Sequence, residues 1–77
     1  MTHKSINIDP EILGGTPVFT GTRVPIKSLF DYLEGGDTLE EFLDNFPSVK
    51  KELAIEVLQI AEKLATSEKI LNENIIG

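Results

Sequence analysis

The sequence predicts a mainly helical fold, in which an N-terminal β-hairpin or β-arm precedes a three-helix bundle of the homeodomain-like or winged helix-turn-helix kind. Apolar residues alternate with period two near the N-terminus and then repeat at i, i+3, i+4 and i+7 from Val24 onward. Glycines and prolines separate these segments. We expect one domain over residues 1–77, divided into a β-arm (1–23), a three-helix helix-turn-helix core (24–66) and a C-terminal extension (67–77).

The β-arm is predicted from two short strands and the turns around them. Ile6–Ile8 alternates with period two, and Pro17–Phe19 follows as a second strand. Gly14-Gly15-Thr16 and Thr20-Gly21-Thr22 suit turns, because glycine adopts positive φ without steric cost. Neither segment has the order of a Walker or dinucleotide-binding motif, so we interpret both as turns and not as a phosphate cradle.

Two amphipathic helices are predicted next. The first follows Pro25, which suits a first helical turn, and ends at Gly35-Gly36. The second opens at Thr38, and Glu41 three residues later completes a capping-box pattern. The inward stripes are Ile26, Leu29, Phe30 and Leu33 in the first helix and Leu39, Phe42, Leu43 and Phe46 in the second.

A third helix follows a predicted turn of about three residues, with Ser48 as its N-cap. This spacing is typical of a helix-turn-helix, whose second helix places its first turn in the DNA major groove. That turn offers Ser48, Lys50 and Lys51 for contacts with phosphates or guanine. The alternative, which we favour, is that the lysines belong to a solvated helix face. The expected inward stripe of this helix is Val49, Leu53, Val57, Ile60 and Leu64.

Arg23 and Lys27 are the other basic candidates for DNA contact. Arg23 follows a turn and is placed to reach a phosphate. The alternative, which we favour, is that Arg23 pairs with Asp9 or with a carbonyl group and holds the β-arm against the first helix.

The formal net charge of −6 is concentrated in the middle of the chain. Residues 28–47 contain no lysine or arginine, and the segments on either side are nearly neutral. DNA affinity requires a basic surface, so this block argues against strong operator binding. We interpret the acidic side chains as a solvated helix face and expect no metal and no cofactor. They are Asp31, Glu34, Asp37, Glu40, Glu41 and Asp44.

No catalytic constellation is evident, and we predict that the protein is not an enzyme. The only histidine, His3, lies near the N-terminus, and there is no cysteine, so no serine–histidine or cysteine–histidine pair can be built convincingly. Apolar residues without a core role point instead to partner binding. These candidates are Ile55, on the polar side of the third helix, and Ile70, Leu71, Ile75 and Ile76.

Length and composition favour a small protein that is supported by a partner. A chain of 77 residues buries only about 60% of the surface that its unfolded form exposes, and without cysteine it has no disulfide. No apolar run approaches the roughly 20 residues of a membrane span, and no signal-peptide core follows Met1. We expect a cytoplasmic protein that is not attached to a membrane and forms a homodimer.

The stretch from Asp9 to Pro25, DPEILGGTPVFTGTRVP, resembles the small prokaryotic proteins grouped as domain of unknown function 433. Its most specific part is the pattern Gly-Gly-x-Pro-x-x-x-Gly-Thr-Arg, and the resemblance continues to Pro47 and covers about residues 6–65. The resemblance implies a trihelical fold with an N-terminal β-hairpin, often dimeric. It also implies an antitoxin of a type II toxin–antitoxin pair that sequesters a PIN-like ribonuclease toxin and can bind its own operator DNA. No catalytic residue carries over.

These observations leave several functional hypotheses. The leading hypothesis is a non-enzymatic, antitoxin-like protein that binds and occludes a PIN-like toxin and regulates its own operon. The alternative is a dimeric helix-turn-helix transcriptional regulator that binds DNA and has no toxin partner. A further alternative is a purely structural dimerisation module.

Overall fold

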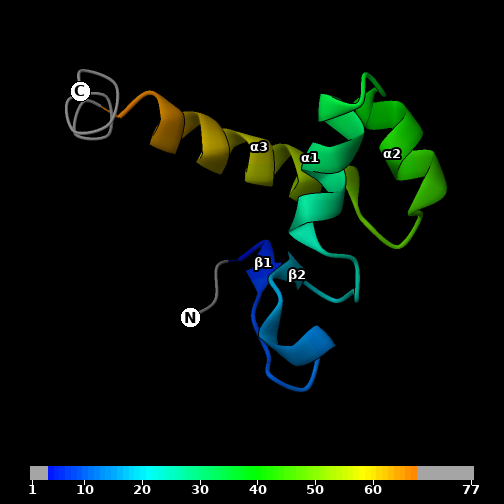
Figure 1. The fold of residues 1–77 in the computed structure, drawn as a ribbon, viewed down its shortest axis with the longest axis vertical. Helices are drawn as coiled ribbons and strands as arrows, with labels where there is room; N and C mark the ends of the chain where they lie inside the picture. The colour runs from blue at the N-terminus through cyan, green and yellow to red at the C-terminus, as the bar shows by residue number, and fades with distance from the viewer. Residues whose placement is uncertain (1–3, 68–77) are drawn as a thin grey trace.

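The computed structural model describes residues 4–67, which form a small two-stranded sheet followed by three helices (Figure 1). The mainly helical fold with a small N-terminal sheet is therefore confirmed. The elements in chain order are β1 (Ile6–Asn7), the 3-10 turn η1 (Leu13–Gly15), β2 (Val18–Phe19), α1 (Ile26–Glu34), α2 (Leu39–Asn45) and α3 (Lys51–Ala65).

The sheet is joined directly to the start of α1. β1 and β2 are antiparallel, with Ile6 opposite Phe19. On the other side of β2, Phe19 N donates to Val24 O and Ile26 N donates to Pro17 O, each at 3.0 Å. β2 is bonded along both sides, and its two residues are fully buried. Backbone hydrogen bonds therefore hold the β-arm against the first helix.

The core gathers around Phe42 of α2, which is 0% exposed. Its ring centroid lies 4.9 Å from that of Phe46, 5.5 Å from that of Tyr32 and 5.9 Å from that of Phe19. Aromatic pairs at these separations stabilise a fold beyond the area that they bury. The rings thus connect β2, α1 and α2. The other buried apolar side chains are Val18, Leu29, Val49, Ala54 and Val57.

The ends of α1 and α2 follow the predicted local signals. Thr38 Oγ1 accepts from Glu41 N at 3.1 Å, and Glu41 Oε1 accepts from Thr38 N at 2.6 Å, so the capping box is confirmed. Gly35 caps α1, and Gly36 has a φ of 95°, a left-handed conformation that favours glycine.

α3 begins later than predicted. Its N-cap is Lys50, whose side chain makes no capping hydrogen bond, so the assignment of Ser48 as the N-cap is wrong. Ser48 lies in the connection Phe46–Lys50, which has five residues and not about three. The cause is Val49, which is buried in the core while its N donates to Phe46 O at 3.0 Å. The chain makes this extra turn before the helix can start.

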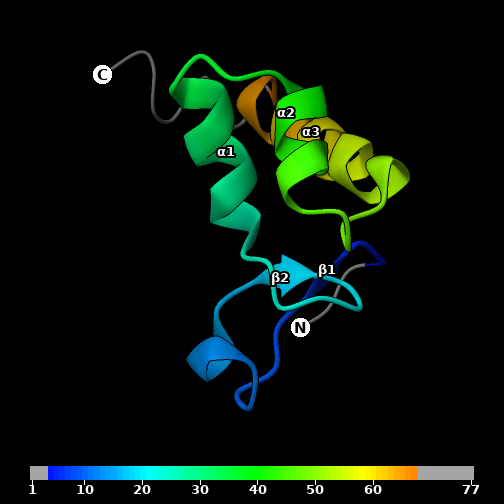
Figure 2. The same ribbon diagram turned by 90° about the vertical axis from the view of Figure 1, so that its right-hand side faces the viewer.

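The second half of α3 leaves the body of the molecule. Ala54 and Val57 in the first half are buried, whereas the side chain of Leu64 is 58% exposed. Figure 1 shows the C-terminal part of α3 leading away from α1 and α2, and Figure 2 views α3 nearly along its axis. Leu64 therefore does not belong to the core stripe that the sequence predicts. No helix in residues 4–67 is long and apolar enough to cross a membrane.

Candidate functional site

Two of the predicted DNA-contact residues line a hollow between the β-arm and the start of α3. Ser48 and Lys50 form one side of this hollow together with Leu53, and Lys4 lies on the other side beside the Thr20-Gly21 turn. We call it the lysine hollow. Within residues 4–67, neither of its lysines forms an ion pair. The fold thus brings together two unpaired positive charges that are far apart in the sequence.

Sheet pairing places Lys4 at the lysine hollow. Thr20 N donates to Ser5 O at 3.0 Å, which fixes the residue after Lys4 beside the turn that follows β2. Gly21 has a φ of 81°, so this turn needs a residue that tolerates the left-handed region. The sequence analysis did not assign Lys4 to the DNA-contact set, because only strand pairing brings it close to the third helix.

Lys50 occupies an unusual position for a lysine. At an N-cap, Ser, Thr, Asp or Asn accepts a hydrogen bond from the first turn and stabilises the helix by about 1 kcal/mol. A positive side chain is also unfavourable at the positive end of the helix dipole. The side chain of Lys50 makes no capping bond, and Leu53 N already donates to Lys50 O at 3.0 Å, so the amides left for an external anion are those of Lys51 and Glu52. The lysine side chain and the free amides beside it can attract a phosphate, but a lysine at this position stabilises the helix poorly.

Lys27 and Lys51 are each engaged within the molecule. Lys27 Nζ donates to Asp31 Oδ1 at 2.7 Å, and this bond with its charge raises the pKa of Lys27 above its ordinary value. Lys51 Nζ lies 3.3 Å from Glu40 Oε2 and connects the start of α3 with α2. All four side chains are more than half exposed, so both pairs are weak and open to exchange.

Arg23 is exposed, and the prediction that it pairs with Asp9 or a carbonyl group is wrong. Within residues 4–67 its guanidinium makes no hydrogen bond or ion pair. Asp9 Oδ1 instead accepts from Glu11 N at 2.9 Å, inside its own turn. The hydroxyl group of Thr22 instead holds the turn between β2 and α1, because it donates to Phe19 O at 2.9 Å and accepts from Val24 N at 3.0 Å.

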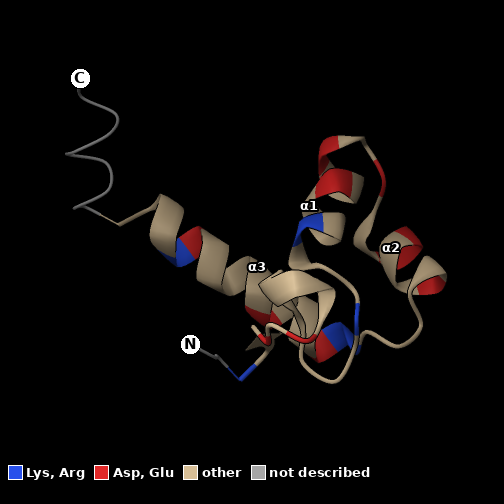
Figure 3. Ribbon diagram, turned by 60° about the horizontal axis from the view of Figure 1, so that its bottom comes forward, with Lys and Arg blue, Asp and Glu red and all other residues tan. Residues whose placement is uncertain are grey.

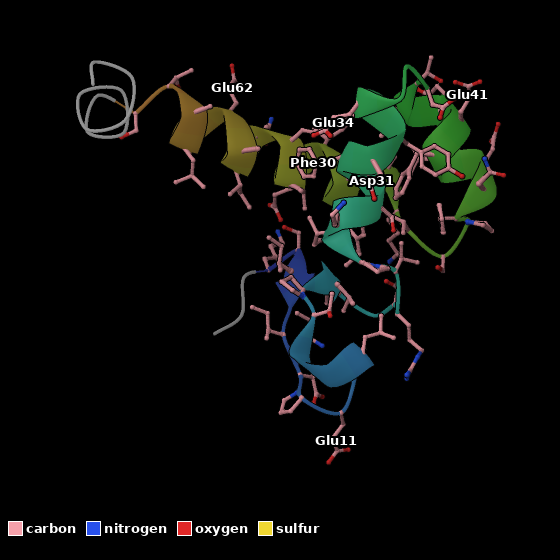
Figure 4. The ribbon with its side chains drawn as sticks, viewed as in Figure 1. Glu11, Phe30, Asp31, Glu34, Glu41 and Glu62 are labelled. Atoms are coloured by element: carbon pink, nitrogen blue, oxygen red, sulfur yellow. The ribbon has the colours of Figure 1, made fainter. Side chains whose placement is uncertain are left out.

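The acidic residues gather at the end of the molecule formed by α1 and α2 (Figure 3). We call this surface the acidic face. All six side chains are exposed: Asp31, Glu34, Asp37, Glu40, Glu41 and Asp44. Figure 4 places Glu34 and Glu41 at this end and Glu11 at the tip of the β-arm. In residues 4–67, Glu34, Asp37 and Asp44 have no ion pair, and no three His, Asp or Glu side chains are grouped to hold a metal.

Of the predicted partner-binding residues, only one falls within the described part of the chain. Ile55 is 38% exposed, on the outer side of α3, as its position in the helical pattern indicates. The remaining candidates lie outside the described residues: Ile70, Leu71, Ile75 and Ile76. The structure adds Ile8, Leu13 and Leu64 as exposed apolar side chains that the sequence analysis missed.

Comparisons with known proteins identify the family. A family model described as "Protein of unknown function (DUF433)" matches residues 6–61. The crystal structure of a DUF433 member protein from Anabaena variabilis ATCC 29413 is similar, with a TM-score of 0.68 and 28% sequence identity, over 92% of this chain and 68% of that chain. The uncharacterized protein y4eO of Sinorhizobium fredii (strain NBRC 101917 / NGR234) is 40% identical over 47 residues, which are 61% of this chain and 21% of that protein. The chain therefore spans about a fifth of that relative's length, and it belongs to the DUF433 family.

Proposed function

We propose that this protein is an antitoxin-like binding protein that occludes a PIN-like ribonuclease toxin. The supporting observation is the acidic face, which presents six exposed carboxylates in a stretch, residues 28–47, without a single lysine or arginine. A ribonuclease needs positive charge where it holds the RNA backbone. Opposite charge steers such a partner and favours its docking. The acidic face can cover that surface of the toxin without any catalytic group of its own.

The acidic face is rigid enough to act as a preformed docking surface. The capping box fixes the first turn of α2, and Phe42 anchors the helix in the core. Because both helices are folded before binding, little backbone entropy is lost on association.

The direct test is co-expression with the product of the neighbouring gene, which the proposal expects to be a PIN-like nuclease. We compare Glu34→Lys/Asp44→Lys, in the acidic face, with Glu11→Lys/Glu62→Lys, whose residues lie on the β-arm and on α3 (Figure 4). Each substitution raises the charge by two, so both variants change from −6 to −2. None of the four side chains forms an ion pair within residues 4–67. The comparison therefore separates the effect of where the charge changes from the effect of the net charge on nuclease binding.

The acidic-face variant should lose at least about tenfold in affinity for the nuclease, equivalent to 1.4 kcal/mol, and in its inhibition of RNA cleavage. The matched control should keep both. If the two variants weaken binding equally, the net charge of the protein and not the acidic face determines its affinity for the nuclease. If the wild-type protein neither binds nor inhibits the neighbouring nuclease, the antitoxin proposal fails.

The lysine hollow favours a second candidate function, a DNA-binding regulator. In a helix-turn-helix the first turn of the second helix approaches the major groove, and here that turn carries Lys50 beside Ser48 and Lys4. A lysine at the N-cap of α3 weakens the helix but suits a phosphate contact. The five-residue connection is longer than the usual three or four residues, so the docking angle differs from the standard motif.

Titration of binding to the gene's own upstream DNA against salt concentration tests this candidate. Lys4→Ala/Lys50→Ala should reduce the slope of log K against log salt by about 1.8, because each phosphate contact contributes about 0.9. Lys63→Ala removes a positive charge from the other end of α3, outside the lysine hollow, and should leave the slope nearly unchanged. If the wild type shows no binding at low salt, this second candidate is rejected.

A further inference from the structure

We propose that the lysine hollow binds a phosphomonoester, the phosphate group of a small molecule such as a nucleotide or a sugar phosphate. The inference goes beyond both candidate functions, because its ligand is neither a protein nor DNA. The hollow is lined by Lys4, Thr20, Gly21, Ser48, Lys50 and Leu53.

The lysine hollow is a concave site between two separate parts of the fold. Figure 2 shows the connection between α2 and α3 reaching down to the two-stranded sheet, where the hollow lies. Its volume of about 500 Å³ falls within the range of small-molecule sites, roughly 300–1,000 Å³. A single phosphate group can enter such a hollow, whereas the backbone of a DNA duplex is bound by an extended basic surface.

The charges in the hollow match those of a phosphomonoester. Lys4 and Lys50 supply two positive charges, and neither forms an ion pair within residues 4–67. No Asp or Glu of the described residues lines the hollow, and Glu40, which contacts the start of α3, is paired with Lys51. A phosphomonoester carries close to two negative charges at neutral pH. The two ammonium groups can therefore neutralise it through charge-assisted hydrogen bonds.

The overall charge of the protein favours a small anion over a long one at this site. The chain has a formal net charge of −6, and duplex DNA carries one negative charge per about 1.7 Å. Charges are screened beyond about 8 Å at physiological ionic strength. A small ligand in the hollow therefore interacts mainly with the two lysines, whereas a duplex extends over more of a surface that is acidic overall.

Uncharged groups around the same space suit the rest of the ligand. The hydroxyl groups of Thr20 and Ser48 make no hydrogen bond within residues 4–67, so both can donate to a phosphate oxygen. A phosphate group has three strong acceptor oxygens to receive such bonds. Leu53 adds an apolar wall, against which the carbon atoms of a sugar or a base can pack.

The walls of the hollow are fixed before any ligand binds. Thr20 N donates to Ser5 O at 3.0 Å, which holds the segment that carries Lys4. On the other side, Val49 is 4% exposed and anchors the residues before and after it in the core. A preformed site loses little conformational entropy on binding.

The lysine at residue 50 brings no structural benefit to the free chain. It occupies the N-cap of α3 without a capping bond, at the positive end of the helix dipole. Natural proteins break such local rules mainly at functional sites. A bound phosphate would give Lys50 a counterion and would place negative charge where the dipole of α3 favours it. Ligand binding thus accounts for a residue that the fold alone does not explain.

An NMR titration of the full chain with inorganic phosphate, at constant ionic strength, tests the site without nuclease or DNA. Saturable shifts of the Gly21 and Lys51 amide signals should give a dissociation constant on the order of millimolar. Lys4→Ala and Lys50→Ala should each raise this constant at least about fivefold, because each removes one charge-assisted contact. Lys63→Ala, which removes one charge at the other end of α3, is the matched control and should leave it unchanged.

Two outcomes of this titration would overturn the proposal. One is a wild type without saturable shifts at phosphate concentrations on the order of 100 mM. The other is a loss of affinity in Lys63→Ala that equals the loss in the variants of the hollow.

Lys50→Asp separates ligand binding from stability. This variant should unfold at a higher urea concentration than the wild type, because aspartate caps α3, and it should no longer bind phosphate. Loss of binding in a more stable protein cannot result from unfolding. Retained binding would contradict the role of Lys50 in the site.

Titrations with AMP, ribose 5-phosphate and adenosine identify the ligand. The first two carry a phosphomonoester and should bind at least as tightly as inorganic phosphate, and the tighter of them distinguishes a nucleotide from a sugar phosphate. Adenosine should not bind, and equal binding of adenosine and AMP would show that the hollow does not recognise phosphate. If the upstream DNA binds through Lys4 and Lys50 while no phosphorylated compound does, the DNA-binding candidate stands and this proposal fails.

Discussion

Replacing Phe42 with alanine tests whether the aromatic cluster holds α2, and with it the acidic face, in place. Phe42 is 0% exposed, and its ring lies against those of Phe19, Tyr32 and Phe46. Truncating a buried phenylalanine to alanine costs about 3–5 kcal/mol. The three aromatic partners, each contributing about 0.5–1.5 kcal/mol, place this site at the upper end of that range. We therefore expect a loss of about 4–5 kcal/mol.

That loss is large compared with the stability of a domain of this size. At about 0.05–0.15 kcal/mol per residue, 77 residues correspond to roughly 4–12 kcal/mol. Phe42→Ala should therefore be mostly unfolded, or unfold at a much lower urea concentration than the wild type. Phe42→Leu, which keeps much of the apolar volume, should lie between the two.

Urea denaturation followed by circular dichroism measures the change. Ile55→Ala, at an exposed position of α3, is the control and should change the free energy of unfolding by about 0.5 kcal/mol or less. If Phe42→Ala and Ile55→Ala had the same urea midpoint, Phe42 would not be the anchor of α2 and the description of the core would be refuted.

Further predictions concern the helix ends, and thermal or urea unfolding checks each of them. Thr38→Ala should lower the free energy of unfolding by about 1 kcal/mol. The double variant Thr38→Ala/Glu41→Ala should lose less than the sum of the two single losses, since both residues act in one capping box. Strictly additive losses would contradict the capping box. Ser48→Ala should change stability by less than about 0.5 kcal/mol, whereas a loss near 1 kcal/mol would return the N-cap role to Ser48. Lys50→Asp should stabilise the protein by about 1 kcal/mol while removing a charge from the lysine hollow, and no gain would mean that α3 is not capped there. Gly36→Ala should cost about 1–2 kcal/mol through its backbone alone, because an added Cβ meets no atom within 4 Å, and an unchanged midpoint would exclude its left-handed conformation.

Local signals in the sequence were sufficient to predict that two short strands and three helices follow one another in this protein. The period of the apolar residues, the capping box at Thr38 and the glycine pair after α1 each act over a few residues, so they are readable without tertiary structure. The acidic face could also be predicted from the sequence. Its six carboxylates lie in residues 28–47, and charges this close in the sequence stay together in any fold that keeps both helices.

Tertiary structure alone decided which side chains meet and where α3 begins. Burial of Val49 moved the N-cap from Ser48 to Lys50, and strand pairing brought Lys4 to the same hollow. The apolar stripe of the third helix predicted Leu64 as a core residue, yet no other element of residues 4–67 reaches that part of α3 closely enough to bury it. Periodicity shows which face of a helix is apolar, but whether that face is covered depends on contacts between segments distant in the sequence, which local patterns do not encode.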